Sequence, residues 1–159
     1  MALTGNDNYF EDFEQGQVIQ HARGKTMCEQ DNVGITLQVL NTAEAHFNED
    51  LMSRSPDGMS AWTQRVQYGG VTISMVIGMT MQDTGENAIA ELELDKIRLQ
   101  APVFHGDTLY AFTLVLGKED SDREDAGIVH FKHWGVNQNE QTVFEGERKV
   151  LVKRRSHYQ

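Results

Sequence analysis

The fold is decided by the stretch VQYGGVTISMVIGMTMQD at residues 66–83. No charged residue interrupts it between Val66 and Gln82, and a helix formed from it would be apolar on most of its circumference. Such a helix must be buried. The run falls short of the roughly 20 apolar residues that a membrane span requires. The sequence therefore predicts a long core helix from Gly70 to Gln82.

The beginning of this helix carries Tyr68-Gly69-Gly70. Free backbone N–H groups and the positive end of the helix dipole gather at such a point, where an anion or a carbonyl oxygen can bind. Two glycines also serve simply to make the turn into a helix. From these residues alone both interpretations stay open.

Length and composition indicate an ordinary globular domain. The chain has 159 residues, of which 39% are hydrophobic, and its formal net charge is −10. We expect one domain over residues 1–159, with loose tails at residues 1–8 and 156–159. The negative charge argues against partners such as nucleic acid or an anionic membrane surface.

Cys28 is the only cysteine, so the sequence offers neither an intrachain disulfide nor a thiolate metal cluster. Residues 1–13 are acidic and lack the basic-then-apolar order of a secretory signal. We therefore expect a cytoplasmic protein.

The remaining sequence predicts two helices before the core helix and a sheet after it. Helical spacing of Val33, Leu37 and Leu40 favours an amphipathic helix over residues 29–40. The other expected elements are a short strand at residues 18–19, a short helix at 43–51, a loop at 53–64, and strands at 88–99, 108–116, 127–136 and 142–153, with a bulge near Asp95-Lys96. Consecutive strands with short connections imply an antiparallel sheet, which gives an α+β fold.

Few residues offer chemistry. Gly69-Gly70 lacks the later positions of a nucleotide phosphate loop, and no His or Cys pair has metal-ligand spacing, so no metal site is expected. His130 and His133 lie three apart in a predicted strand and should face opposite sides of the sheet. His46 lies between a helix and the glycine turn, where an imidazole could move a proton; it could equally be a structural residue.

Several motifs together resemble the MaoC-like dehydratase family, which has the hot-dog fold and includes the (R)-specific enoyl-CoA hydratases. They are Asn41-x4-His46, the turn Tyr68-Gly69-Gly70, and the sequences FHGDTL at residues 104–109 and ERKVLV at residues 147–152. The branch of mesaconyl-CoA and β-methylmalyl-CoA hydratases is the most similar, through YFEDF at residues 9–13 and PVFHGDT at residues 102–108. The resemblance implies a long buried helix wrapped by an antiparallel sheet.

The resemblance also implies roles for site residues. His46 stands at the position of the catalytic histidine, and the N–H of Gly69 at that of the group that polarises the thioester carbonyl. Tyr68 and Gly70 flank that group as substrate-binding residues. Asn41 occupies the position of the family's aspartate, and Ala43 that of an asparagine. Asn41 cannot act as a base, so it would orient the water or the His46 ring in a modified site.

The implied reaction is reversible hydration of an α,β-unsaturated acyl-CoA, branched or dicarboxylic, by a homodimer or higher homo-oligomer. No cofactor is expected, since CoA is part of the substrate. The candidates for binding its phosphates are Lys96, Arg98, Arg148 and Lys149. Two other functions stay open: an acyl-CoA thioesterase that uses the same Gly69 site, and a non-catalytic acyl-CoA-binding protein, which the residues Asn41 and Ala43 favour.

Overall fold

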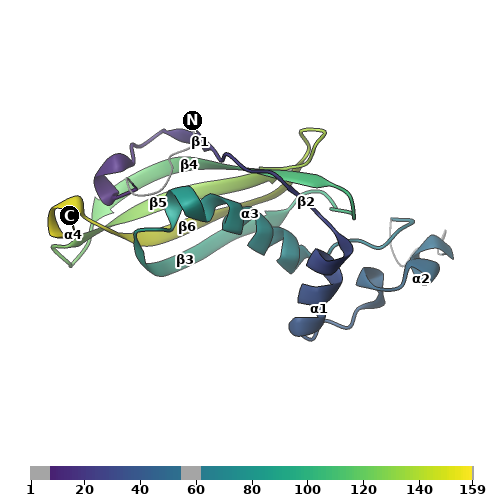
Figure 1. Cartoon of the computed structure of the whole chain (residues 1–159). Coiled ribbons are helices and arrows are strands. Elements are labelled where there is room, and N and C mark those ends of the chain that lie inside the picture. Colours follow the sequence, from purple (N-terminus) through teal and green to yellow (C-terminus); the bar gives the residue numbers. More distant parts are fainter. Residues whose placement is uncertain (1–7, 55–61, 159) are drawn as a thin grey trace.

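The computed structural model describes residues 8–54 and 62–158, in which a curled antiparallel sheet wraps a long helix (Figure 1). The helix is α3 (Gly69–Thr84). The strands are β1 (Val18–Gln20), β2 (Lys25–Thr26), β3 (Ala88–Leu99), β4 (Thr108–Asp120), β5 (Ala126–Val136) and β6 (Thr142–Lys153). The shorter helical segments are η1 (Phe10–Asp12), η2 (Gln30–Gly34), α1 (Ile35–Gln38), η3 (Glu44–His46), α2 (Glu49–Arg54) and α4 (Arg155–Tyr158). The α+β architecture expected from the sequence is confirmed.

The strands follow the order β1-β4-β5-β6-β3, with β2 pairing to the other end of β4. All pairs are antiparallel, as expected. β3 does not pair with β4, its neighbour in sequence; it crosses to the far edge and pairs with β6. The expected bulge is confirmed, because the β3–β6 register shifts between Asp95 and Arg98, and Lys96 has a φ of 49°. β4 continues beyond its predicted end at Leu116, so the acidic turn to β5 is short.

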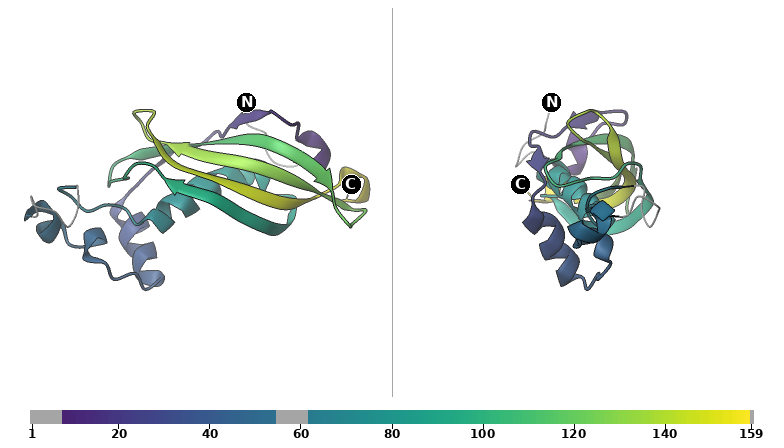
Figure 2. Two further views of the ribbon diagram at one scale, coloured as in Figure 1. Left: turned by 180° about the vertical axis from the view of Figure 1, so that it is seen from behind. Right: turned by 90° about the vertical axis from the view of Figure 1, so that its right-hand side faces the viewer.

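Helix α3 begins and ends within two residues of its predicted limits. Its buried residues include Val71, Val76 and Thr80, and this side packs on the inner face of β4, β5 and β6. The end-on view in Figure 2 shows the sheet curling around the helix. Burial of apolar residues on both layers is what holds them together.

The inner face of the sheet is divided into two apolar clusters. One, toward the N-terminal segment, contains Phe10, Phe13, Ile19, Val115, Val129, Phe131, Val150 and Val152. The other, toward the start of α3, contains Met27, Val71, Val76, Val103, Leu109, Ala111, Val143 and Phe144. Thr113, His133 and Arg148 lie between the two clusters, one on each of three neighbouring strands. The core therefore has a polar row across its middle.

The polar row is a continuous chain of hydrogen-bonded side chains. His21 Nδ1 lies 2.6 Å from Asp83 Oδ2, and His21 Nε2 lies 2.7 Å from Thr113 Oγ1. Thr113 Oγ1 is 2.8 Å from His133 Nδ1, and His133 Nε2 is 3.2 Å from Arg148 Nη1. Since an unpaired buried polar group is costly, this pairing is what lets the row exist in the core.

His130 and His133 face opposite sides of β5, as their spacing predicts. His133 is buried on the inner face. His130 Nε2 lies on the outer face, 2.9 Å from Glu147 Oε2.

One local expectation is wrong. In the helix near residues 30–38, Leu37 and Leu40 are exposed, and the buried residue is Thr36. The first part, η2, is a π-helical turn, so the simple helical spacing of apolar residues does not hold there. Most of the predicted loop at residues 53–64 lies outside the described residues.

The expected loose tails also differ where they are described. Asn8 is buried, and its Nδ2 donates to the Gln82 carbonyl oxygen at 2.9 Å. Residues 155–158 form α4, which the bond from Tyr158 Oη to Asp125 Oδ2 ties to the turn before β5. Hydrogen bonds therefore tie Asn8 and Tyr158, the first and last described residues, to the body of the domain. None of the helices in residues 8–54 and 62–158 has the length and hydropathy to cross a membrane.

Candidate functional site

His46 is held in one orientation by the backbone. Its Nδ1 lies 2.8 Å from the carbonyl oxygen of Val66, which can only accept a hydrogen bond. Nδ1 therefore carries the proton, and in the neutral ring Nε2 keeps a lone pair. A neutral imidazole fixed in this tautomer can accept a proton at Nε2.

The start of α3 leaves two backbone N–H groups without an acceptor among the described residues. The Tyr68 N–H donates to Asn32 Oδ1 at 3.0 Å, and the Val71 N–H donates to the Tyr68 carbonyl at 2.9 Å. Gly69 and Gly70 are the first two residues of the helix, so α3 itself offers their N–H groups no acceptor. Both groups lie at the positive end of the helix dipole, which favours an oxygen carrying negative charge.

His46 and Gly69 line the same cavity, of about 290 Å³. The other residues that line it are Trp62, Val66, Gln67, Thr72, Leu99, Gln100, Ala101, Pro102 and Val103. Within the described part of the chain this lining carries no acidic side chain and no Lys or Arg. The structure thus brings together the imidazole and the helix start on which the sequence hypothesis depends, in an uncharged cavity.

Tyr68 and Gly70 lie beside this cavity without lining it. The Tyr68 ring packs against His46 with ring centroids 5.6 Å apart. A Cβ at position 70 would lie 2.5 Å from the Tyr68 ring, so glycine is needed there to let the ring sit over the helix start. These two residues shape the helix start, and a direct role in binding stays a prediction.

Asn41 is placed away from the cavity lining. Its Oδ1 accepts the Ala43 N–H at 3.1 Å, which makes it a turn residue in the loop before η3. None of the nearby acids substitutes for the family's aspartate at the cavity: Glu49 pairs with Arg65, and Asp50 pairs with Arg54. Glu44 starts η3 and does not line the cavity either. The acid–base group of the described lining is His46.

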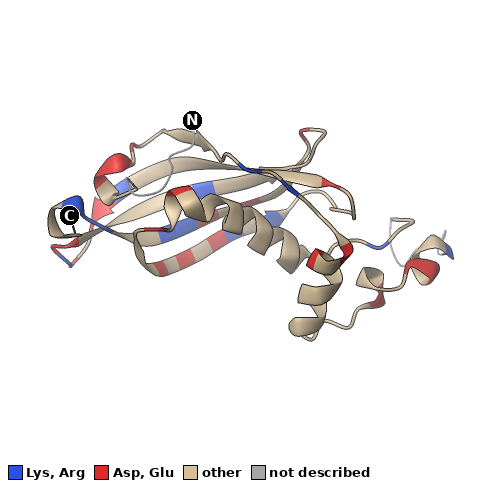
Figure 3. Ribbon diagram, in the orientation of Figure 1, with Lys and Arg blue, Asp and Glu red and all other residues tan. Residues whose placement is uncertain are grey.

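The four basic residues considered for binding the CoA phosphates lie in different environments. Arg148 is buried and bonded to Glu91, with Nε 2.7 Å from Oε2, so it belongs to the core and the expectation for it is wrong. Lys96 and Lys149 lie on the outer surface, paired with Glu147 and Glu93. Along the β3 ribbon, acidic residues alternate with uncharged ones (Figure 3). Arg98 is exposed, has no ion pair within the described residues, and directly precedes Leu99 of the cavity lining.

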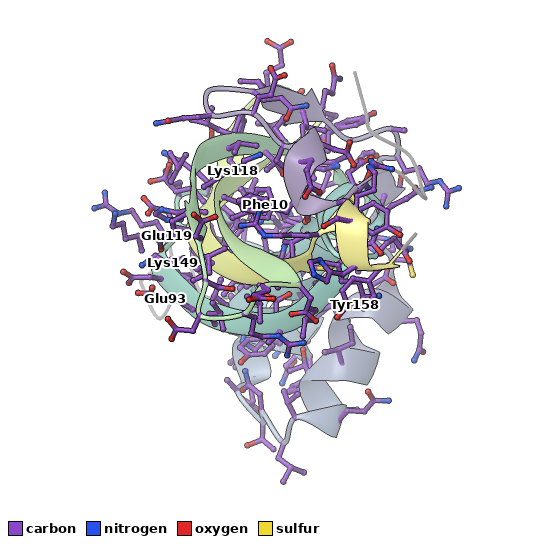
Figure 4. The ribbon with its side chains drawn as sticks, turned by 90° about the vertical axis from the view of Figure 1, so that its left-hand side faces the viewer. Phe10, Glu93, Lys118, Glu119, Lys149 and Tyr158 are labelled. Carbon is purple, nitrogen blue, oxygen red and sulfur yellow. The ribbon has the colours of Figure 1, made fainter. Side chains whose placement is uncertain are left out.

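A second hollow, of about 300 Å³, lies at the end of the molecule shown in Figure 4, on the outer face of the sheet. Lys118, Glu119, His130 and Lys149 are among its lining residues. The Lys118 ammonium donates to the Phe10 carbonyl oxygen at 2.7 Å, and Lys149 is paired with Glu93. Its main cations are therefore neutralised or bonded within the chain. Across residues 8–54 and 62–158, no group of three or more His, Cys, Asp or Glu side chains is placed to hold a metal ion.

The sequence did not point to two residues that organise the site. Val66 orients His46, and Asn32 bonds both the His46 backbone and the helix start. Neither has a local pattern that marks it, because these contacts join residues 14 to 36 positions apart.

Comparisons with known proteins cover nearly the whole chain. The profile of the mesaconyl-CoA hydratase family matches residues 3–154. The chain is 34% identical to a mesaconyl-CoA hydratase of Haloarcula marismortui, over 96% of this chain and 44% of that protein. It is also 34% identical to a beta-methylmalyl-CoA dehydratase of Chloroflexus aurantiacus, over 97% of this chain and 42% of that protein.

A solved structure of a MaoC-domain protein from Chloroflexus aurantiacus is similar with a TM-score of 0.84 and 31% sequence identity. That likeness covers 98% of this chain and 43% of the other, and with other solved structures it shows the hot-dog fold. The chain thus spans less than half the length of these proteins. The helix start, His46 and the whole sheet lie inside the matched span, and the chain belongs to the mesaconyl-CoA hydratase family.

Proposed function

We propose that this chain catalyses the reversible hydration of an α,β-unsaturated acyl-CoA thioester. The observation that carries the proposal is the shared cavity of His46 and Gly69, with the His46 proton fixed on Nδ1 by the Val66 carbonyl. Family membership supports it, because the matched relatives are named as a hydratase and a dehydratase of CoA thioesters.

In the proposed reaction His46 Nε2 takes a proton from water as the water oxygen bonds to the β-carbon. The electron pair of the C=C bond forms a double bond between the α-carbon and the carbonyl carbon, the carbonyl pair moves to the thioester oxygen, and the N–H of Gly69 stabilises the resulting enolate. The imidazolium then returns its proton to the α-carbon, which restores the carbonyl and completes the addition of water. One histidine thus serves as base and then as acid. Asn41 contributes through the turn that leads to His46.

The acyl group is proposed to be short, and branched or dicarboxylic, by analogy with the relatives' names. The cavity supports a short chain, since about 290 Å³ is at the lower end of ligand-pocket volumes. Gln67 and Gln100 are the amide side chains of the lining that could bond a polar substituent.

A second copy of this chain is part of the proposal. The relatives are long enough for two such domains, since the chain covers 44% and 42% of them. β3 is an edge strand on which Leu92, Leu94, Ile97 and Leu99 are 41–52% exposed. A long apolar edge of this kind favours association. A homodimer covering β3 would also close the side of the cavity formed by Leu99, and Arg98 would be available there for a CoA phosphate. A cytoplasmic location stays a prediction.

The test is an assay of the purified chain with short, branched and dicarboxylic enoyl-CoA and 3-hydroxyacyl-CoA thioesters. Loss of enoyl absorbance without release of free CoA supports hydration. His46→Ala should lower turnover by about 10²–10⁴-fold, the usual share of acid–base catalysis. The matched control is His157→Ala, which removes an exposed histidine from α4. Equal turnover of His46→Ala and wild type would exclude the assignment.

A second candidate function is non-catalytic binding of acyl-CoA. It is favoured by the absence of any carboxylate from the described cavity lining and by the turn role of Asn41. Saturable binding of acyl-CoA without turnover of any thioester in the panel would select it. Release of free CoA at constant enoyl absorbance would select a thioesterase.

A further inference from the structure

The side chain of Asn32 connects the two halves of the candidate site. Its Nδ2 donates to the carbonyl oxygen of His46 at 3.1 Å, and its Oδ1 accepts the N–H of Tyr68 at 3.0 Å. These partners lie 14 and 36 residues away along the chain. One amide thus bonds both the residue that carries the imidazole and the residue that precedes Gly69.

Thr36 adds a third hydrogen bond to this amide. Thr36 is completely buried, and its Oγ1 donates to Asn32 Oδ1 at 3.3 Å. Because the N–H of Tyr68 can only donate, the oxygen of the amide must face it, where this oxygen also accepts from the Thr36 hydroxyl. The NH₂ group must then face the His46 carbonyl. The carbonyl oxygen of Thr36 also accepts the Asn41 N–H at 3.0 Å, so the same helical segment holds the start of the 41–46 loop.

The backbone bonds made by Val66 and Gln67 end short of the helix. The Val66 N–H donates to the Ala45 carbonyl at 3.1 Å, and the Gln67 N–H donates to the Val103 carbonyl at 2.8 Å. α3 has no side-chain cap of its own, because Tyr68 cannot supply one. Among the hydrogen bonds of the described residues, those of Asn32 link the His46 segment to Tyr68, the residue directly before the helix.

We infer that Asn32 is a positioning residue that sets the separation of the His46 ring and the free N–H groups at the start of α3. The inference rests on the proposed function for its effect on turnover, since both groups must meet one bound thioester. A misplacement of about 1 Å between reacting groups can cost on the order of 10²-fold in rate.

Two substitutions separate the two bonds. Asn32→Asp keeps an oxygen for the Tyr68 N–H and the Thr36 hydroxyl but cannot donate to the His46 carbonyl. Asn32→Ala removes both contacts. The matched control is Asn137→Ala in the β5–β6 turn, where a buried Asn accepts the N–H groups of Asn139 and Gln141 at 3.0 and 3.1 Å. All three proteins are first compared with wild type for folded fraction by thermal unfolding.

With an active wild type, turnover per folded molecule should fall by about 10–100-fold in Asn32→Ala, with KM changed by less than about threefold. Turnover per folded molecule should also fall in Asn32→Asp, because the His46 carbonyl loses its hydrogen-bond donor. Asn137→Ala should keep wild-type turnover per folded molecule. Unchanged turnover in Asn32→Ala, or a loss shared by the Asn137 control, would overturn the inference.

A second readout does not need activity. In protein carrying ¹⁵N-labelled histidine, the Nδ1–H of His46 bonded to Val66 gives a resonance that reports the ring position. It should shift or broaden in Asn32→Ala and stay in place in Asn137→Ala. If the wild type turns over no thioester, the proposed function fails while this measurement still decides the role of Asn32. An unmoved His46 resonance in Asn32→Ala would contradict that role.

Discussion

His21 and Asp83 are joined by a hydrogen bond of 2.6 Å between side chains that are almost entirely buried, although the residues are 62 positions apart. One arrangement of protons fits every hydrogen bond of the polar row: Arg148 donates to His133, His133 to Thr113, Thr113 to His21, and His21 to Asp83. This requires both imidazoles to be neutral. Burial lowers the pKa of His21 although Asp83 opposes it, and burial with the nearby Arg148 charge holds the pKa of His133 well below its usual value.

The stability of the fold should therefore depend on pH around neutrality. An unfolded chain protonates its histidines near pH ~6.5, whereas the folded chain keeps both buried rings neutral, so the unfolded state binds more protons as the pH falls. The free energy of unfolding should decrease below about pH 6.5, by up to about 1.4 kcal/mol per pH unit for each ring. Urea unfolding from about pH 7.5 to 5.5 measures this, a window above the titration of most carboxylates. His157→Ala should leave the slope unchanged, and a flat profile in wild type would contradict the neutral row.

Asp83→Ala should destabilise the domain without disabling the site. The substitution leaves the buried His21 Nδ1–H without its acceptor, which costs about 1–3 kcal/mol. Asp83 lies 14 residues after Gly69, or roughly 21 Å along α3, so turnover per folded molecule should be retained. Urea unfolding and the enoyl-CoA assay measure the two quantities. The exposed Asp122→Ala serves as control, with an expected change within about 0.5 kcal/mol. If Asp83→Ala loses no more unfolding free energy than Asp122→Ala, the hydrogen bond between His21 and Asp83 is dispensable.

Gly69→Ala should reduce turnover through a collision with Leu99. A Cβ at position 69 would lie 2.3 Å from Leu99 Cδ1, so the leucine must move into or away from the cavity. We expect turnover to fall by about tenfold or more, since small displacements at a reacting centre slow the reaction strongly. The double variant Gly69→Ala/Leu99→Ala should recover much of it, because alanine still supplies the N–H. Gly78→Ala, which places its Cβ in open space, is the matched glycine control. No recovery in the double variant would assign the loss to the backbone at position 69.

Arg65 should make turnover sensitive to salt. Its side chain pairs with Glu29 and, at 2.9 Å, with Glu49, which ties the residue before Val66 to the residue before η2 and to the start of α2. Arg65→Ala should lower turnover about two- to tenfold as the Val66 carbonyl loses its fixed position, in keeping with about 0.5–1 kcal/mol for each exposed ion pair. Wild-type turnover should fall toward the variant's level in about 1 M salt, because ions screen exposed pairs. Arg54→Ala breaks a similar exposed pair within α2 and should change neither quantity. Identical salt profiles for Arg65→Ala and wild type would contradict this role.

The elements with strong local signals were predictable from sequence. The charge-free run gave the position of α3 because a helix of that composition has to be buried, and the change of alternation near Asp95 marked a bulge that the β3–β6 register confirms. The pairing of β3 with β6 had no such signal. It depends on how the sheet closes around α3, and short connections between consecutive strands suggested other neighbours.

The two central groups of the site could be predicted from the sequence, but the residues that hold them in place could not. His46 and Gly69 meet at one cavity, as the resemblance implies, while Asn41 turns to the Ala43 N–H. The sequence offered no reason to single out Asn32 or His21. The His46 carbonyl and Tyr68 N–H that Asn32 binds, and the Asp83 and Thr113 side chains that His21 binds, lie from 14 to 92 residues away, so only the folded chain brings those groups within hydrogen-bonding distance.

The polar row divides the interior of the domain into two separate apolar parts. The apolar cluster that contains Phe131 and the one that contains Phe144 lie on opposite sides of the polar row, and they have no residue in common. Energies of substitutions at sites without shared partners add, whereas those of touching residues do not. The losses of unfolding free energy caused by large-to-small substitutions in the two clusters should therefore add. A substitution in the polar row should instead show an interaction energy with substitutions in either cluster. Each half of the interior can then be repacked separately, with the hydrogen-bonded chain as a fixed boundary between two small hydrophobic cores.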